Sequence, residues 1–77
     1  MTDVEYVLEW YDKKTEFVVD EQVISMTAVQ LKKLFDLEEI LGDCYRVESK
    51  HVTQLQKLTK HKIDLTRYNY SVCLQQA

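Results

Sequence analysis

The chain has 77 residues, 45% of them apolar and 30% charged, which excludes a disordered polymer and leaves room for one domain, residues 1–77, with one core. No segment approaches the ~20 apolar residues of a membrane span. The net charge of −3 is divided unevenly, because residues 1–48 carry twelve acids and five bases, whereas residues 49–77 carry five bases and the single acid Asp64. Such an uneven distribution of charge indicates a binding partner of opposite charge, because the electric field of the protein steers a partner to its surface and favours one of complementary charge.

The first part of the sequence predicts a β-hairpin. Two runs, which start at Tyr6 and Phe17, alternate between apolar and polar or amphipathic side chains, the period of a half-buried strand. The turn between them is expected to have residues 13–14 at its tip and Asp12 at its first position, and the sequence leaves open a loop of two or of four residues. The expected cross-strand pairs in the core are Trp10 with Phe17 and Leu8 with Val19, and Tyr6 and Val23 are expected to point the same way.

A helix is predicted to follow the hairpin. Thr27 and Gln30 form the T-x-x-Q pattern of a capping box, in which each side chain binds the other residue's free backbone N–H. Residues 31–35 then place apolar side chains on one stripe. The segment 36–42 either extends this helix or adds a separate turn, and Gly42 is its expected left-handed terminator.

The remaining sequence predicts a short strand at residues 44–47, a helix capped by Ser49 and a final strand at residues 68–75. The fold class is therefore α+β, in the order ββα(β)αβ. Three or four antiparallel strands form a sheet, both helices cover one face, and the other face is open. The open face is expected to show Glu5, Glu9, Asp20, Asn69 and Ser71.

The sequence indicates no catalytic apparatus. Nucleophilic catalysis requires a base beside a serine or cysteine, whereas His51 and His61 are expected to be solvated at the two ends of the second helix. Cys44 and Cys73 lie 29 residues apart without a CxxC pair, which predicts two ordinary thiols rather than a zinc site or a disulfide. The sequence has neither the residue spacings of a metal site nor a glycine-rich phosphate-binding loop. We therefore expect a protein that is not an enzyme and that binds no cofactor and no metal.

Two segments resemble a family of small uncharacterised bacterial domains. Residues 6–13 match its opening pattern Y-x-x-E-x-Y-D-K, and residues 63–70 match its closing pattern D-L-x-R-Y-x-Y, with Asn69 where an acid is expected. Leu34–Phe35 and the D-x-Y-x-V strand at 43–47 fill the middle, so the resemblance covers most of the chain. Such domains are often candidate immunity proteins of polymorphic toxin systems, and the resemblance implies that context here.

We therefore expect an immunity protein that binds and neutralises a cognate toxin, a basic nuclease, through an acidic surface. Such a surface imitates the charge of a phosphate backbone and accelerates encounter. The residues expected to bind the toxin are Glu9, Tyr11 and Asp12 of the hairpin and Asp36, Glu38, Glu39 and Asp43 of the acidic turn. The start of the chain has neither the basic residues nor the apolar stretch of a secretory signal, which predicts a cytoplasmic protein without a membrane contact.

Two alternatives belong to other classes of function. A small nucleic-acid-binding regulator would use the basic C-terminal part, although the overall acidity of the chain argues against a nucleic-acid partner. The basic residues of that part are Lys50, Lys57, Lys60, Lys62 and Arg67. A structural subunit would assemble with copies of itself through edge strands, and the sequence leaves the oligomeric state open.

Overall fold

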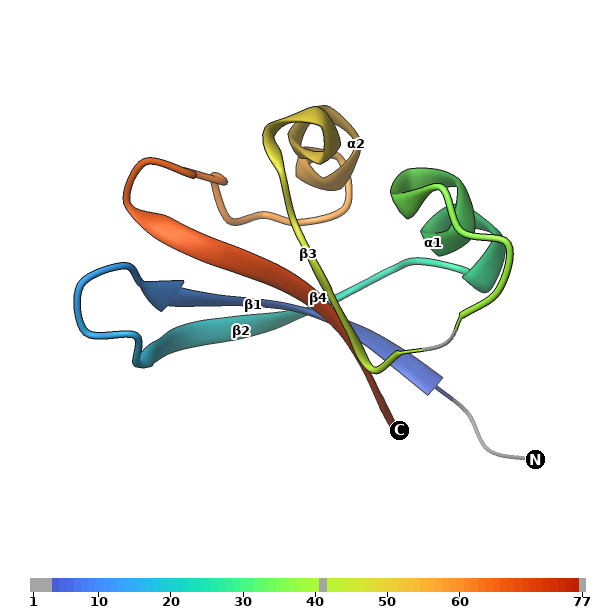
Figure 1. Cartoon of the computed structure of the whole chain (residues 1–77), viewed down its shortest axis with the longest axis horizontal. Coiled ribbons are helices and arrows are strands. Elements are labelled where there is room, and N and C mark those ends of the chain that lie inside the picture. Colours follow the sequence, from blue (N-terminus) through green and yellow to red (C-terminus); the bar gives the residue numbers. More distant parts are fainter. Residues whose placement is uncertain (1–3, 41, 77) are drawn as a thin grey trace.

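A computed structural model describes residues 4–40 and 42–76. Its elements are β1 (Val4–Asp12), β2 (Val18–Ile24), α1 (Ala28–Phe35), β3 (Cys44–Arg46), the 3-10 turn η1 (Ser49–His51), α2 (Val52–Gln56) and β4 (Tyr68–Gln76). The strands form one antiparallel sheet in the order β2-β1-β4-β3, and both helices lie on one side of it (Figure 1). The predicted α+β fold and its element order are confirmed. No helix among the described residues is long and apolar enough to cross a membrane.

The core lies between the sheet and the helices. Strand β1 contributes alternate side chains, as its period of two predicts, and the adjacent strand β4 contributes Tyr70 and Val72. Leu31 of α1 and Leu55 of α2 complete the core on the side of the helices. Burial of each such side chain stabilises the fold by about 1.5–3 kcal/mol. The β1 members are Tyr6, Leu8 and Trp10.

The hairpin turn is a four-residue loop. The backbone N–H of Asp12 donates to Phe17 O over 3.0 Å, so that residues 13–16 form a four-residue loop. The Asp12 carboxylate accepts the N–H groups of Lys14 and Thr15, at 2.7 and 3.1 Å. These bonds from a turn-initiating aspartate define the loop. The predicted first position of Asp12 is confirmed, and of the two loop lengths that the sequence left open the structure has the longer one.

Strand β2 contains a bulge that reverses its alternation. Tyr11 lies opposite Val18, but Trp10 lies opposite Asp20, which leaves Val19 without a partner on β1. Because side chains alternate with a period of two, one extra residue moves every following side chain to the other face. Ile24 is consequently buried, with 3% of its surface exposed. The predicted pairs of Trp10 with Phe17 and Leu8 with Val19 are wrong, and Phe17, Val19 and Val23 are exposed.

Helix α1 begins at the predicted capping box. The Thr27 hydroxyl accepts the N–H of Gln30, and the Gln30 side-chain oxygen accepts the N–H of Thr27. The helix ends at Phe35, where Asp36 takes the left-handed conformation, with φ 55°. Gly42 has no positive φ, so the prediction that it terminates the helix is wrong. Aspartate tolerates the left-handed region because its short polar side chain makes local hydrogen bonds.

The second helical segment starts in a 3-10 turn. Ser49 is the first residue of η1 and Glu48 precedes it in an extended conformation, so the N-cap residue is Glu48 rather than the predicted Ser49. Leu55 is buried, and Val52 and Leu58 are half-buried against the core, as their spacing predicts.

Candidate protein-binding face

No helix or strand formed by the described residues covers the side of the sheet opposite the helices (Figure 1). We call it the open face. Because directly paired residues point to the same side of a sheet, the strand registers assign its members. They are Glu5, Val7, Glu9 and Tyr11 of β1, Val18, Glu21 and Val23 of β2, Asn69, Ser71, Cys73 and Gln75 of β4, and Cys44 and Arg46 of β3.

Four of the five residues predicted for this face lie on it. The exception is Asp20, which lies opposite Trp10 and so belongs to the side of the sheet that carries the helices. Its displacement has the same cause as the exposure of Val23, namely the bulge at Val19. The bulge therefore decides which β2 side chains belong to the open face.

The open face has an apolar centre with acidic side chains around it. Val7 lies between Val23 and Cys73 and is only 2% exposed, although it is not part of the core under the helices. Val23 is 56% exposed. Around this centre stand three glutamates and one arginine, Arg46. An apolar centre inside a polar rim is the usual anatomy of a protein–protein interface.

Two of the three glutamates of the open face are direct cross-strand neighbours. Glu9 lies directly opposite Glu21 on β2, a like-charged cross-strand pair that costs stability. The third glutamate, Glu5, accepts a hydrogen bond of 3.1 Å from the side chain of Gln75. This arrangement favours a cationic group bound against the face.

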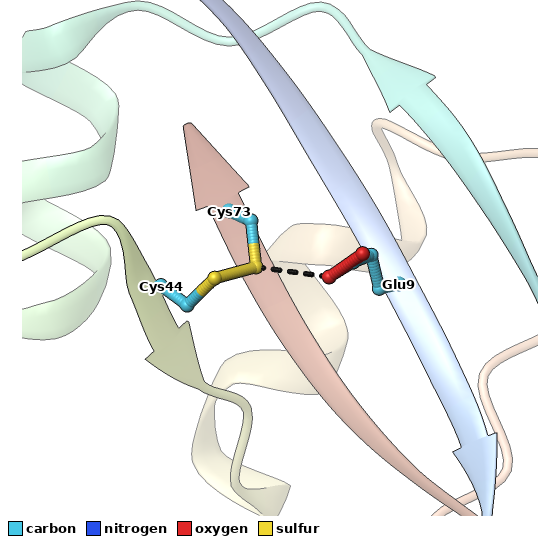
Figure 2. Close-up of side chains that lie close together, drawn as sticks. All are labelled: Glu9, Cys44 and Cys73. Atoms are coloured by element: carbon cyan, nitrogen blue, oxygen red, sulfur yellow. Dashed lines mark hydrogen bonds between the residues drawn. A yellow bond between two sulfur atoms is a disulfide. The ribbon is translucent and has the colours of Figure 1, made fainter. Parts of the chain in front are cut away.

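A disulfide between Cys44 and Cys73 joins the edge strand β3 to β4 (Figure 2). The two residues lie directly opposite each other, with their Cα atoms 4.0 Å apart. Glu9 Oε2 lies 3.1 Å from the Sγ atom of Cys73. The prediction of two ordinary thiols is wrong. The separation of two cysteines along the sequence does not indicate how β3 pairs with β4, and this pairing is what places the two cysteines opposite each other.

The three predicted hairpin residues divide between two places. Glu9 and Tyr11 are half-buried on the open face. Asp12 lies at the hairpin turn, where its hydrogen bonds from the backbone N–H groups of Thr15 and Lys14 lower the pKa of its carboxyl group. Asp12 thus holds the loop in addition to carrying charge.

The acidic turn lies far from the hairpin turn. The connection between α1 and β3 and the hairpin turn are at opposite ends of the long axis of the molecule (Figure 1). In this connection Asp36 ends α1, and the carbonyl of Asp43 accepts the N–H of Leu74 over 2.7 Å. The predicted acids here, Asp36, Glu38, Glu39 and Asp43, are all exposed. The structure therefore does not bring the seven predicted residues into one site.

The two histidines are packed rather than solvated, which contradicts the expectation. His51 is 4% exposed, and its Nδ1 accepts the N–H of Glu48 over 2.9 Å, while its Nε2 has no hydrogen-bond partner. Burial, with a smaller contribution from the charge of Lys50, lowers the pKa of His51. His51 is therefore a neutral core residue at neutral pH.

His61 stacks on Trp10, with ring centroids 3.9 Å apart and an angle of 14° between the ring planes. Its Nε2 lies 2.6 Å from the hydroxyl of Tyr70, which also accepts the N–H of Asp64. Burial raises the pKa of Tyr70. These bonds attach the connection after α2 to the sheet, so His61 has a structural role.

A basic hollow of about 350 Å³ lies between the two helices. Its apolar lining comes from Met26, Leu34 and Leu58, and its charges come from Lys33 and Lys57. Both lysines are exposed. Two lysines thus stand at the hollow on the helix side, whereas three glutamates stand on the open face.

A model of a family described as a domain of unknown function, DUF7683, matches residues 5–73. The matched range includes all three glutamates of the open face and both cysteines. No curated protein compared with the chain matches it.

Proposed function

The chain belongs to the DUF7683 family, and we propose that it is an immunity-type protein that binds and neutralises a basic toxin domain through its open face. The observation that supports this most is the combination of an apolar centre at Val7 and Val23 with glutamates around it. A surface of this kind excludes water at its centre and selects a cationic partner at its rim.

Electrostatic steering makes such a protein associate rapidly with its toxin. An acidic face attracts a basic nuclease over a distance and raises the association rate constant to about 10⁸–10⁹ M⁻¹s⁻¹ in strongly steered pairs. The same negative charge competes with the phosphate backbone for the nuclease surface. A cytoplasmic location, where a producing cell needs protection, fits this role.

The contact residues follow from the position of each acid. Glu5, Glu9 and Glu21 pair with lysine or arginine side chains of the toxin, and Tyr11 adds an apolar contact at the end of the face. Tyrosine suits this task because it combines a large apolar ring with a hydroxyl group. The acids of the α1–β3 connection contribute to the long-range field from one end of the molecule.

The test uses the tagged protein as bait in lysate of its own source cells, at low and at moderate salt, with mass spectrometry of the eluate. Two double variants have the same change of net charge. One reverses the open face (Glu5→Lys with Glu21→Lys), and the other reverses the acidic connection (Glu38→Lys with Glu39→Lys). We expect the unmodified protein to retain one basic toxin-like polypeptide in stoichiometric amount, with binding weakened by the open-face variant far more than by the connection variant.

Three results contradict the proposal. If both variants lose the partner to the same extent, binding depends on the net charge of the protein rather than on the open face. Nuclease-sensitive nucleic acid in the eluate, abolished by Lys57→Glu with Lys60→Glu, assigns function to the basic part of the chain. Recovery of the protein alone, together with a molecular mass in solution that increases with concentration, indicates that its function is self-assembly.

A further inference from the structure

Three potential metal ligands from three strands meet on the open face (Figure 2). They are the carboxylate of Glu9 on β1 and the sulfur atoms of Cys44 on β3 and Cys73 on β4, and these ligand atoms lie within 4.8 Å of one another. From this cluster we propose that the protein, once its disulfide is reduced, binds a thiophilic divalent cation such as Zn²⁺ through Glu9, Cys44 and Cys73.

The strand register brings the three side chains together. Cys44 and Cys73 are direct cross-strand neighbours. Glu9 lies opposite Ser71, two residues before Cys73 on the same face, which is the diagonal position that a long side chain reaches. Because all three ligands stand on paired strands of one sheet, the site is held by rigid elements rather than by loops.

The distances suit a tetrahedral zinc site. Zinc binds thiolate sulfur at about 2.3 Å and carboxylate oxygen at about 2.0–2.2 Å, which places neighbouring ligand atoms of a tetrahedron about 3.3–3.8 Å apart. Glu9 Oε2 is already 3.1 Å from Cys73 Sγ. Once the disulfide is reduced, the Cys44 and Cys73 sulfur atoms are free to separate to the spacing of two zinc ligands. Cys44 is exposed, so a cation enters from solvent and a water molecule takes the fourth position.

The position of Glu9 is the second observation that points to a cation. In the disulfide neither sulfur carries a hydrogen atom, so the Glu9 carboxylate and Cys73 Sγ are two acceptors in contact, with no donor between them. Glu9 also faces the like charge of Glu21. Reduction gives Cys73 a thiol hydrogen that the Glu9 carboxylate can accept. A divalent cation bound to Glu9 and the two thiolates then offsets the like charge of Glu21.

Oxidation and reduction control the site. A dithiol reductant transfers two electrons and two protons to the Cys44–Cys73 bond, which breaks into two thiols while the reductant becomes a disulfide. Zn²⁺ then displaces both thiol protons and binds the two thiolates. The site is therefore available to a metal in a reducing compartment, where thiols are the prevailing form of cysteine pairs, and not in an oxidising one. Exchange with a small-molecule disulfide, which takes up the two electrons and becomes two thiols, re-forms the Cys44–Cys73 bond, removes both sulfur ligands and releases the metal.

This inference goes beyond the proposed function and does not depend on it, because metal binding is measured without a partner protein. The probe is Co²⁺, which in a tetrahedral thiolate site gives thiolate-to-metal charge-transfer absorption and strong visible bands. The full chain is reduced, freed of reductant under argon and titrated with Co²⁺, and Zn²⁺ is then added to displace it. We expect one Co²⁺ per chain, displacement by one Zn²⁺, and no such absorption from the oxidised protein.

Variants assign the ligands. Cys44→Ser and Cys73→Ser are each expected to abolish the charge-transfer absorption, and Glu9→Gln to weaken binding by at least about tenfold. Glu5→Gln is the matched control, because this glutamate lies on the same strand and the same face but outside the cluster, and it should bind as the unmodified protein does. Circular dichroism of each reduced variant establishes that it is folded.

The proposal is overturned if the folded, reduced protein gives no tetrahedral cobalt spectrum. It is equally overturned if Glu9→Gln and Glu5→Gln bind alike, which removes Glu9 from the site. A stoichiometry of one metal per two chains also contradicts it, since that result indicates a four-cysteine site shared between copies.

Discussion

At the scale of single residues, the histidines show how packing changes the chemistry of a side chain. Two histidines at the ends of a basic helix are typical of solvated groups, yet His51 is buried against Phe35 and His61 is stacked on Trp10. Sequence periodicity places a residue on a helix face but does not report which loop or strand folds over it. The burial of His51 has a measurable consequence for the dependence of stability on pH.

His51 is expected to destabilise the protein as the pH falls below about 6.5, the ordinary pKa of histidine in an unfolded chain. Its folded-state pKa is lowered, so below this pH the unfolded state binds a proton that the folded state resists. The contribution of His51 is therefore fully present above about pH 6.5 and is lost as the pH decreases toward the folded-state pKa, with a slope of at most about 1.4 kcal/mol per pH unit.

Urea unfolding at a series of pH values between neutral and mildly acidic measures this slope. The control variant is His51→Asn, whose side-chain oxygen can still accept the N–H of Glu48 but which does not titrate. We expect the free energy of unfolding of the variant to depend less on pH in this range. Equal slopes for both proteins would show that another group causes the loss. Asp12 and Asp64, whose pKa values are also lowered, titrate in a more acidic range.

At the scale of elements, the bulge in β2 is the feature that separates the structure from the sequence-based expectation. A period-two pattern specifies a strand but not the point at which an extra residue interrupts the pairing. The sequence placed Val23 in the core, whereas the register places Ile24 there. Two alanine variants on adjacent positions distinguish these registers.

Ile24→Ala is expected to lower the free energy of unfolding by about 2–5 kcal/mol, because it leaves a cavity in the core. Val23→Ala, its neighbour on the open face, is expected to change this quantity by no more than about 0.5–1 kcal/mol. Urea denaturation of both variants at neutral pH makes the comparison. If Val23→Ala lowers the free energy of unfolding more than Ile24→Ala does, the result would indicate a register without the bulge, in which Val23 lies in the core and not on the open face.

The elements also show what sequence reasoning predicts well. The capping box at Thr27 and Gln30, the inward parity of β1 and the alternation of β4 are local patterns, and each is confirmed. The end of α1 at Asp36 and the pairing of Cys44 with Cys73 depend on backbone conformation and on a strand register across 29 residues. Local signals therefore gave the fold class, whereas the composition of the open face required the strand pairing.

At the scale of the whole molecule, charges of opposite sign gather at two places on the two sides of the sheet. The open face carries Glu5, Glu9 and Glu21, and the hollow between the helices carries Lys33 and Lys57. The α1–β3 connection lies at one end of the molecule and the hairpin turn at the other (Figure 1). A basic partner is thus drawn to one side of the sheet. This is the central claim of the proposed function.

The most direct test of that claim is a methyl nuclear magnetic resonance spectrum of the protein, with labelled valine and leucine, during titration with the partner that the bait retains. The account predicts that the resonances of Val7 and Val23 shift or broaden as the open face is covered, while those of Leu34 and Leu58 beside the helix hollow stay in place. Changes confined to Leu34 and Leu58, with Val7 and Val23 unaffected, would place the partner on the basic side and contradict the account.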